Sequence, residues 1–269
     1  MATRDEVIDV LVGEERLSAT LVTPATQLPG VLFLHGWGGS QSQYIARARQ
    51  VAALGCVCLT VDFRGHEKTN EQRETVTREH NLQDVVSAYD VLASQAAVDK
   101  SAIAVVGTSY GGYLAALLTA LRPVRWLALR APALYKDSDW DVPKLALRQA
   151  QDLDRYRRRR NEPADNRALA ACAAFRGDVL IVESGQDIVI PHQTIESYRE
   201  ALKHARSLTY RVVDKADHAL SDPSCREVYT AILVNWITEM VSGWRAPDVD
   251  RQTLMRQGMK AQAGAPESA

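Results

Sequence analysis

Apolar runs alternate with segments of helical periodicity along most of the chain. The runs that read as strands are Gly30–Leu34, Cys56–Val61, Ser101–Val106, Trp126–Leu129, Val179–Val182 and Leu208–Val213. Several are continuously apolar, as expected of parallel strands covered on both faces. Helical spacing predicts helices over Gln43–Leu54, Leu82–Leu92, Tyr113–Leu118, about His192–His204 and about Ser224–Trp244. This alternation predicts an α/β fold, with a mostly parallel central sheet and helices on both faces.

Some segments depart from this alternation. The β-prone runs Glu6–Val12 and Arg16–Val22 predict an antiparallel hairpin at the edge of a sheet. The polar stretch Lys68–Arg78 has no clear period and predicts a long loop. Residues 133–176 contain no strand candidate and are rich in charge, with helix-like pieces around Leu145–Arg158 and Arg167–Phe175. We interpret this insertion as a small helical lid within a single domain, residues 1–245, and residues 246–269 as a flexible tail.

Composition and charge narrow the classes of partner. The 269 residues include 32 Lys and Arg against 33 Asp and Glu, a net charge of -1, which argues against nucleic acid as a partner. The four cysteines have no metal-ligand spacing, so we expect free, buried thiols. The N-terminus is charged, and no apolar run reaches the ~18 residues of a membrane helix. We expect a cytoplasmic protein that takes a small-molecule substrate, with no membrane partner, metal or cofactor.

A Gly-x-Ser-x-Gly motif follows the strand that ends at Val106 and precedes an apolar helix. The motif is Gly107-Thr108-Ser109-Tyr110-Gly111. A serine hydroxyl is a weak nucleophile at neutral pH, so it must be exposed beside a base. A sharp turn between strand and helix does this, because the flanking glycines let the two elements approach. An ordinary turn is the alternative, and the flanking strand and helix favour a nucleophile.

An acid and a base follow Ser109 at the positions that such a site requires. Asp187 comes just after the strand Val179–Val182, and His218 comes between the last strand and the closing helix. The carboxyl ends of parallel strands meet at one edge of the sheet, where open α/β sheets bind ligands. The order Ser, Asp, His therefore predicts a catalytic triad.

The chain resembles the α/β-hydrolases, over roughly residues 6–243. The layout is similar to small serine esterases and to the prolyl-oligopeptidase-like branch, which is related to dienelactone hydrolases. The motifs that carry the resemblance are Gly107–Gly112, His35–Gly38, Asp62–Gly65, Gly185–Asp187 and Asp217-His218. The resemblance implies Ser109 as nucleophile, Asp187 as the acid and His218 as general base and then acid, with an oxyanion hole formed by the backbone N–H groups of Trp37 and Tyr110.

Other residues near these motifs have alternative readings. His35 is expected to brace the loop after it, with ionisation in catalysis as the alternative. His66 and His80 are expected to pack or be solvated, with lining of the site as the alternative. Asp62 and Arg64 are expected to form an ion pair or a hydrogen-bond network. Asp217, or one of Asp137, Asp139 and Asp141, is an alternative acid. Tyr135 and Trp140 are candidates for lining the substrate pocket. The arginines between 155 and 160 form either a solvated face or a selector for a carboxylate or phosphate on the substrate.

The sequence thus predicts a serine hydrolase that cleaves carboxylic esters of small molecules through an acyl-enzyme. A peptidase, amidase or thioesterase with the same triad is the first alternative, and a non-catalytic ligand receptor on this scaffold is the second. Dehalogenase and dienelactone hydrolase chemistry would use Asp or Cys at position 109, and the serine argues against both. A homodimer stays open.

Overall fold

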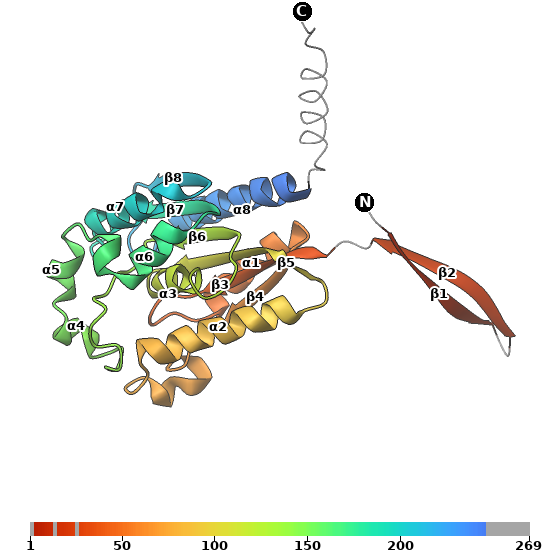
Figure 1. Ribbon diagram of the computed structural model, residues 1–269, viewed down its shortest axis with the longest axis horizontal. Coiled ribbons are helices and arrows are strands. Elements are labelled where there is room, and N and C mark those ends of the chain that lie inside the picture. Colours follow the sequence, from red (N-terminus) through yellow and green to blue (C-terminus); the bar gives the residue numbers. More distant parts are fainter. Residues whose placement is uncertain (1–2, 13–14, 25–26, 246–269) are drawn as a thin grey trace, which may run out of the picture.

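Six parallel strands form the central sheet of the protein. The computed structural model describes residues 3–12, 15–24 and 27–245. The strand order is β4-β3-β5-β6-β7-β8, and every neighbouring pair is parallel. The bounds are β3 Leu28–Leu34, β4 Val57–Val61, β5 Val98–Thr108, β6 Trp126–Arg130, β7 Asp178–Ser184 and β8 Ser207–Val213. The predicted α/β fold is confirmed (Figure 1).

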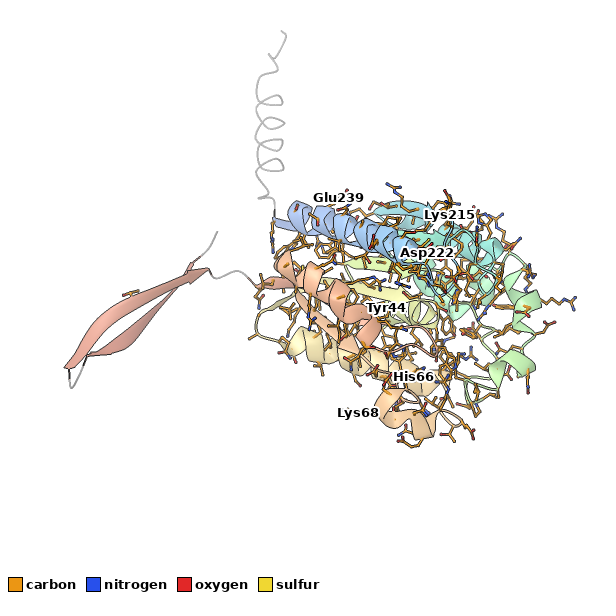
Figure 2. All side chains as sticks on the ribbon, turned by 180° about the vertical axis from the view of Figure 1, so that it is seen from behind. Tyr44, His66, Lys68, Lys215, Asp222 and Glu239 are labelled. Atoms are coloured by element: carbon orange, nitrogen blue, oxygen red, sulfur yellow. The ribbon has the colours of Figure 1, made fainter. Side chains whose placement is uncertain are left out.

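Helices cover both faces of this sheet (Figures 1 and 2). Val31 and Phe33 of β3 belong to the core layer that includes α1 and α8, and Leu32 and Leu34 belong to the layer that includes α2, α3, α6 and α7. The helices are α1 Ser42–Ala53, α2 Arg78–Ser94, α3 Tyr110–Leu118, α6 Arg167–Ala174, α7 His192–Ala201 and α8 Pro223–Arg245. All four β3 side chains are at most 1% exposed. Each such burial contributes roughly 1.5–3 kcal/mol, which explains the continuous apolar run.

Local sequence signals set the ends of the first two helices. Gly55 follows α1 with φ of 79°, a left-handed conformation that favours glycine. Thr77 caps α2, because its hydroxyl accepts from the N–H of His80 while the His80 ring accepts from the N–H of Thr77. His80 is thus part of a helix cap.

Two predicted segments differ from their expected form. The hairpin of β1 Thr3–Val12 and β2 Glu15–Pro24 forms a two-stranded sheet of its own, so its predicted position at the edge of a larger sheet was wrong. The polar loop contains a short 3-10 helix, η1 Glu67–Gln72. No apolar periodicity marks η1, because none of its side chains is buried. The predicted tail, residues 246–269, lies outside the described residues.

The insertion between β6 and β7 is helical, as predicted. Besides α6 it contains α4 Leu147–Ala150, α5 Leu153–Arg157 and η2 Pro163–Asp165, and η3 Leu202–His204 follows α7 later in the chain. The first expected helix is split because Asp152 has φ of 43° and caps α5. The insertion adds Leu153 and Leu169 to the core beside α3.

The cysteines agree with the expectation of unpaired thiols. All four are free; Cys58 is half-buried, and Cys56, Cys172 and Cys225 are buried. Within the residues described here, no three or more His, Cys, Asp and Glu side chains group together as a metal site would require. No helix in the same part of the chain is both apolar enough and long enough to span a membrane.

Candidate active site

Ser109 occupies a strained turn between β5 and α3. Its backbone has φ of 52° and ψ of -115°, a region that costs a residue with a side chain about 1–3 kcal/mol. Three backbone hydrogen bonds hold it there. The Ser109 N–H donates to Arg130 O at 2.9 Å, and the Ser109 carbonyl accepts from the N–H groups of Ala133 at 2.9 Å and Tyr113 at 3.1 Å. Neighbouring strand and helix thus fix the serine at the carboxyl end of β5.

The two glycines of the motif allow a backbone approach that no other residue would permit. A Cβ at Gly107 would lie 2.4 Å from Gly111 O, and a Cβ at Gly111 would lie 2.4 Å from Leu34 O and 2.5 Å from His35 O. The backbone of α3 therefore packs directly against the backbone of β5 and of the end of β3, with no side chain between them. This contact brings the loop after β3 next to Ser109.

Ser109, His218 and Asp187 form a continuous chain of hydrogen bonds. The Ser109 Oγ lies 3.0 Å from His218 Nε2, and His218 Nδ1 lies 2.7 Å from Asp187 Oδ2. The other carboxylate oxygen, Asp187 Oδ1, accepts from the N–H groups of Val189 and Ile190, both at 2.8 Å. The Asp187 side chain is 2% exposed. Since its carboxylate accepts three hydrogen bonds, it holds His218 in the tautomer with the proton on Nδ1.

The alternative acids do not reach the imidazole. Among the carboxylates of the described residues, only that of Asp187 lies within 4 Å of a His218 ring nitrogen. Asp217 accepts from the N–H of Ser221 at 2.8 Å, and Asp137 accepts from the N–H of Arg167 at 2.7 Å. Asp139 instead accepts from Ser138 and Gln151.

The loop after β3 passes directly over the Ser109 hydroxyl. A Cβ at Gly36 would lie 3.4 Å from Ser109 Cβ and 3.9 Å from Ser109 Oγ. The N–H of Trp37, the next residue, and that of Tyr110, the first residue of α3, have no hydrogen-bond acceptor in the described part of the chain. The rings of Trp37 and Tyr110 meet edge to face with centroids 5.7 Å apart. The backbone N–H groups of Trp37 and Tyr110, which flank the Ser109 hydroxyl, are therefore available as hydrogen-bond donors.

Two buried histidines brace this loop. His35 Nδ1 donates to Gly36 O at 2.8 Å while His35 Nε2 accepts from the N–H of Phe63 at 3.2 Å. His66 Nε2 accepts from the N–H of Gly38 at 3.0 Å. Both bonds to backbone N–H groups need a neutral ring. Burial lowers the pKa of His35 to about 4 and also lowers the pKa of His66, so both rings stay neutral at pH 7.

The expected pairing of Asp62 with Arg64 does not form. Arg64 Nε donates to Asp84 at 2.5 Å, whereas Asp62 accepts from the backbone and side-chain N–H groups of Gln41, both at 2.7 Å. The predicted network therefore exists with different partners, because helix α2 brings Asp84 beside Arg64. These bonds fix the loops after β3 and β4 without touching Ser109.

The other pocket candidates lie away from the cavity that contains Ser109 and His218. Tyr135 is 3% exposed and packs edge-on against the Tyr110 ring, and the guanidinium groups of Arg78 and Arg167 lie over the half-buried Trp140. Neither aromatic residue lines the cavity.

The arginine run of the insertion also lies outside this cavity. Arg157 is buried and donates to Leu134 O at 3.1 Å, and Arg160 is exposed and pairs with Glu200 at 2.8 Å. The run is thus neither wholly solvated nor directed at Ser109.

Sequence reasoning missed three arginines that do line the cavity: Arg47 of α1, Arg130 at the end of β6 and Arg226 of α8. Arg130 also donates to the backbone carbonyl of His218 and, at 3.0 Å, to Ser184 Oγ. Arg130 is the last residue of a buried strand, at the carboxyl edge of the sheet, and this position could have marked it in the sequence as a candidate. No local motif marks Arg47 or Arg226.

Comparison with protein families is consistent with this geometry. The model of the prolyl oligopeptidase family matches residues 42–243, which is most of the chain. The chain belongs to the prolyl oligopeptidase family. Membership of this family, together with the fold, places the chain in the α/β-hydrolase superfamily.

A curated relative and two solved structures illustrate the likeness. The chain is 30% identical to the acylamino-acid-releasing enzyme 2 of Oryza sativa over 109 residues, 38% of this chain and 14% of that enzyme's length. The structure of Est1E from Butyrivibrio proteoclasticus with ferulic acid has a TM-score of 0.60 at 18% identity, covering 80% of this chain and 90% of that one. Dipeptidyl peptidase 4 of Porphyromonas gingivalis has a TM-score of 0.57 at 18% identity, covering 87% and 35%. At these identities the structures share the fold.

Proposed function

We propose that the protein is a serine hydrolase that cleaves carboxylic esters of small molecules through an acyl-enzyme intermediate. The observation that carries the proposal is the hydrogen-bond chain from Asp187 through His218 to the Ser109 hydroxyl. It supplies a nucleophile, a base with a free acceptor nitrogen and an acid that orients the base.

The three side chains of this hydrogen-bond chain have distinct roles in the first half of the reaction. As Ser109 Oγ attacks the ester carbonyl carbon, its proton moves to His218 Nε2. Asp187 stabilises the imidazolium that forms, because the Nδ1 proton already points at its carboxylate. The imidazolium then gives its proton to the alkoxide oxygen of the leaving alcohol, and the acyl group remains on Ser109. A water molecule, activated by the same imidazole, releases the acid in the second half.

The free N–H groups of Trp37 and Tyr110 are the proposed oxyanion hole. Both belong to backbone that is fixed by other bonds, so they need no reorganisation as the negative charge develops on the carbonyl oxygen. Removing one such donor costs other enzymes about 10²–10³-fold in kcat.

Cleavage of an amide bond, as by a peptidase, is a second candidate that the family match supports. The rice relative is named for releasing acylamino acids, and the match to it covers 109 residues, 38% of this chain. The same residues would serve, with the added need to protonate an amine leaving group before the C–N bond breaks. A thioester would require the least help with its leaving group. Rates on matched acetyl ester, thioester and amide substrates rank the three.

Labelling with a fluorophosphonate tests the nucleophile, and p-nitrophenyl acetate and butyrate test the activity. The wild-type protein is expected to be labelled on Ser109 and to hydrolyse both esters, and Ser109→Ala is expected to lose both properties. Ser101→Ala is the matched control, since Ser101 is an exposed serine at the other end of the same strand. A folded wild-type protein that takes no label and cleaves no ester, thioester or amide would instead support the receptor alternative.

A further inference from the structure

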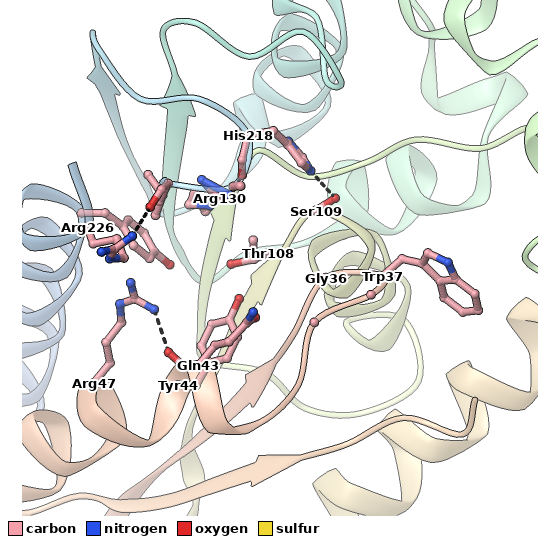
Figure 3. A pocket seen from close by; sticks show the side chains of 15 residues that line it. Gly36, Trp37, Gln43, Tyr44, Arg47, Thr108, Ser109, Arg130, His218 and Arg226 are labelled. Atoms are coloured by element: carbon pink, nitrogen blue, oxygen red, sulfur yellow. Dashed lines mark hydrogen bonds between the residues drawn. The ribbon is translucent and has the colours of Figure 1, made fainter. Parts of the chain in front are cut away.

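The cavity beside Ser109 has a volume of about 490 Å³ and is walled by the core of the protein; among the residues that the structure describes, none from the insertion lines it (Figure 3). Its walls are the loop after β3, the first turns of α1, the ends of β5 and β6, and the segment from His218 into α8. The residues that line it with polar side chains are Gln43, Tyr44, Arg47, Thr108, Ser109, Arg130, His218, Arg226 and Tyr229. A molecule held here lies against the serine and its base.

The charge of this cavity is strongly positive. Three arginines line it, and in the part of the chain that the structure describes no aspartate or glutamate lines it. The chain as a whole has a net charge of -1. The positive charge is therefore a local feature of the cavity rather than a consequence of overall composition.

The three guanidinium groups contact neutral groups instead of carboxylates. Arg47 donates to Thr230 Oγ1 at 2.9 Å and to Gln43 O at 3.2 Å. Arg226 donates to the carbonyls of Leu220 and Ser221, both at 2.8 Å. Within the described residues, no carboxylate lies within 4 Å of any of the three arginines.

The nearest acidic side chains are already engaged elsewhere. Asp217 accepts from the N–H of Ser221 at 2.8 Å, and Asp222 accepts from the N–H of Ser224 at 2.7 Å. Besides these hydrogen bonds, the opposite charges of Arg130 and Arg226 help to lower the pKa of Asp217 and of Asp222, respectively, so the two carboxylates offset part of the positive charge of the cavity without forming an ion pair.

Two of the arginines lie over the same aromatic ring. The guanidinium carbons of Arg47 and Arg130 lie 5.0 Å and 5.8 Å from the centroid of the Tyr229 ring. Arg130 is 3% exposed, and its Nε has no hydrogen-bond partner in the described part of the chain. A buried donor without a partner costs about 1–3 kcal/mol. The positive charges around the cavity would attract an anion.

We infer that this cavity selects esters whose acyl or alcohol part carries an anionic group, a carboxylate or a phosphate, bound by Arg47 and Arg226. The inference rests on the proposed ester hydrolysis, for which it names the substrate class. Figure 3 shows the side chains of Arg47 and Arg226 extending to the same end of the cavity, away from the Ser109 hydroxyl. The scissile carbonyl would then lie at Ser109 and the anion at that far end, with Arg130 supporting the His218 loop between them.

Matched pairs of esters that differ in charge test this selection. On the acyl side, the pair is mono-4-nitrophenyl adipate and its methyl ester. On the alcohol side, 4-acetoxybenzoate and 4-acetoxyphenyl phosphate are compared with methyl 4-acetoxybenzoate, so that carboxylate and phosphate are distinguished. Each kcat/KM is divided by the hydroxide-catalysed rate of the same ester. At least one anionic ester is expected to exceed its neutral partner by about 10–100-fold, as one or two charge-assisted hydrogen bonds provide.

Substitution of the arginines tests which of them cause the preference for anionic esters. Arg226→Gln and Arg47→Gln are each expected to lower the anionic-to-neutral ratio about 10-fold or more, mainly through KM. Arg47→Lys keeps the charge and is expected to keep most of the ratio. Arg160→Gln is the control, because it removes a 63% exposed arginine side chain that does not line the cavity. It is expected to leave the ratio as in the wild type.

The outcomes separate this inference from the proposed function. Hydrolysis of neutral esters without an anionic preference, or a preference that both glutamine variants retain, overturns the inference and leaves the ester hydrolase standing. An equal fall on both members of a pair shows that the arginines are structural and also overturns it. A protein that hydrolyses no ester refutes the proposed function itself.

Discussion

Gly111 is the position where a single methyl group should do the most damage to the site. Alanine there would put Cβ 2.4 Å from Leu34 O and 2.5 Å from His35 O. A carbon and a carbonyl oxygen approach to roughly 3.3 Å at closest, so α3 and the end of β3 would have to separate by about 1 Å. Both contacts are backbone carbonyl oxygens, one of the last residue of β3 and one of the residue after it, and no side-chain rotation can relieve them. Overpacking of this kind costs typically 1–3 kcal/mol.

The same displacement acts on catalysis. The end of β3 leads into the loop that bears the Trp37 N–H, and the start of α3 bears that of Tyr110. A shift of about 1 Å between catalytic groups can cost ~10²-fold in rate. We therefore expect Gly111→Ala to lower kcat by about 10–100-fold and the Tm by roughly 2–12 °C.

Gly243→Ala is the matched control, because it is the same substitution with nothing to clash. No heavy atom lies within 4 Å of a Cβ at Gly243, an exposed position in α8. Alanine is favoured over glycine in a helix by up to about 1 kcal/mol, so this variant should be slightly more stable than the wild type. Urea unfolding followed by tryptophan fluorescence gives both free energies, and ester hydrolysis gives kcat. Equal stability and activity of Gly111→Ala and the wild type would refute the close-contact argument.

Three further outcomes are expected. Asp187→Asn keeps the shape of the side chain but cannot hold the Nδ1 proton of His218, so kcat should fall about 10³–10⁴-fold with little change in Tm. His66→Phe keeps a ring but removes the acceptor of the Gly38 N–H, and should lower kcat about 10-fold and stability by about 1–3 kcal/mol. Burial alone would raise the pKa of Asp178, and hydrogen bonds from Arg206 and Ser207 outweigh it and lower the pKa. Their stabilisation is present above the unfolded pKa of about 3.9 and lost as pH falls below it, so the wild type should lose stability there more steeply than Asp178→Asn.

Each of these three predictions would be contradicted by a specific result. An Asp187→Asn protein with kcat within 10-fold of the wild type would assign the acid to another residue. Unchanged kcat in His66→Phe would mean that the loop keeps its position without the Gly38 bond. Parallel stability curves for the wild type and Asp178→Asn between pH 4 and pH 2 would show that the carboxylate contributes nothing through its charge.

The strands, the motif around Ser109 and the positions of Asp187 and His218 were legible in the sequence because each depends on local pattern. A continuous apolar run predicts a buried strand. The residues that follow such strands are then expected at the carboxyl edge of the sheet. The order Ser, Asp, His can then be recognised in the sequence without any knowledge of the distances between the side chains. The structure adds the hydrogen bonds, which the pattern could only anticipate.

Features set by distant parts of the chain were not legible. Arg64 pairs with Asp84 rather than with Asp62, because packing of α2 brings a residue 20 positions away to the guanidinium. The walls of the cavity come from α1, β6 and α8, and Arg47 and Arg226 share no motif. The insertion was expected to cover the pocket, yet none of its described side chains lines this cavity.

The two histidines that brace the loop after β3 link the integrity of the site to proton concentration. The ring of His35 is inaccessible and its pKa is lowered to about 4, whereas an unfolded chain would bind the proton near pH 6.5. Between these pH values the unfolded state binds a proton at His35 and the folded state does not. The free energy of unfolding therefore falls as the pH is lowered from 6.5 to about 4. The loss is on the order of 3 kcal/mol for His35 alone, and His66 adds to it in the same direction. A domain of ordinary stability, about 5–15 kcal/mol, would thus lose a substantial part of it in mild acid, and the loss originates in the loop that bears the Trp37 N–H.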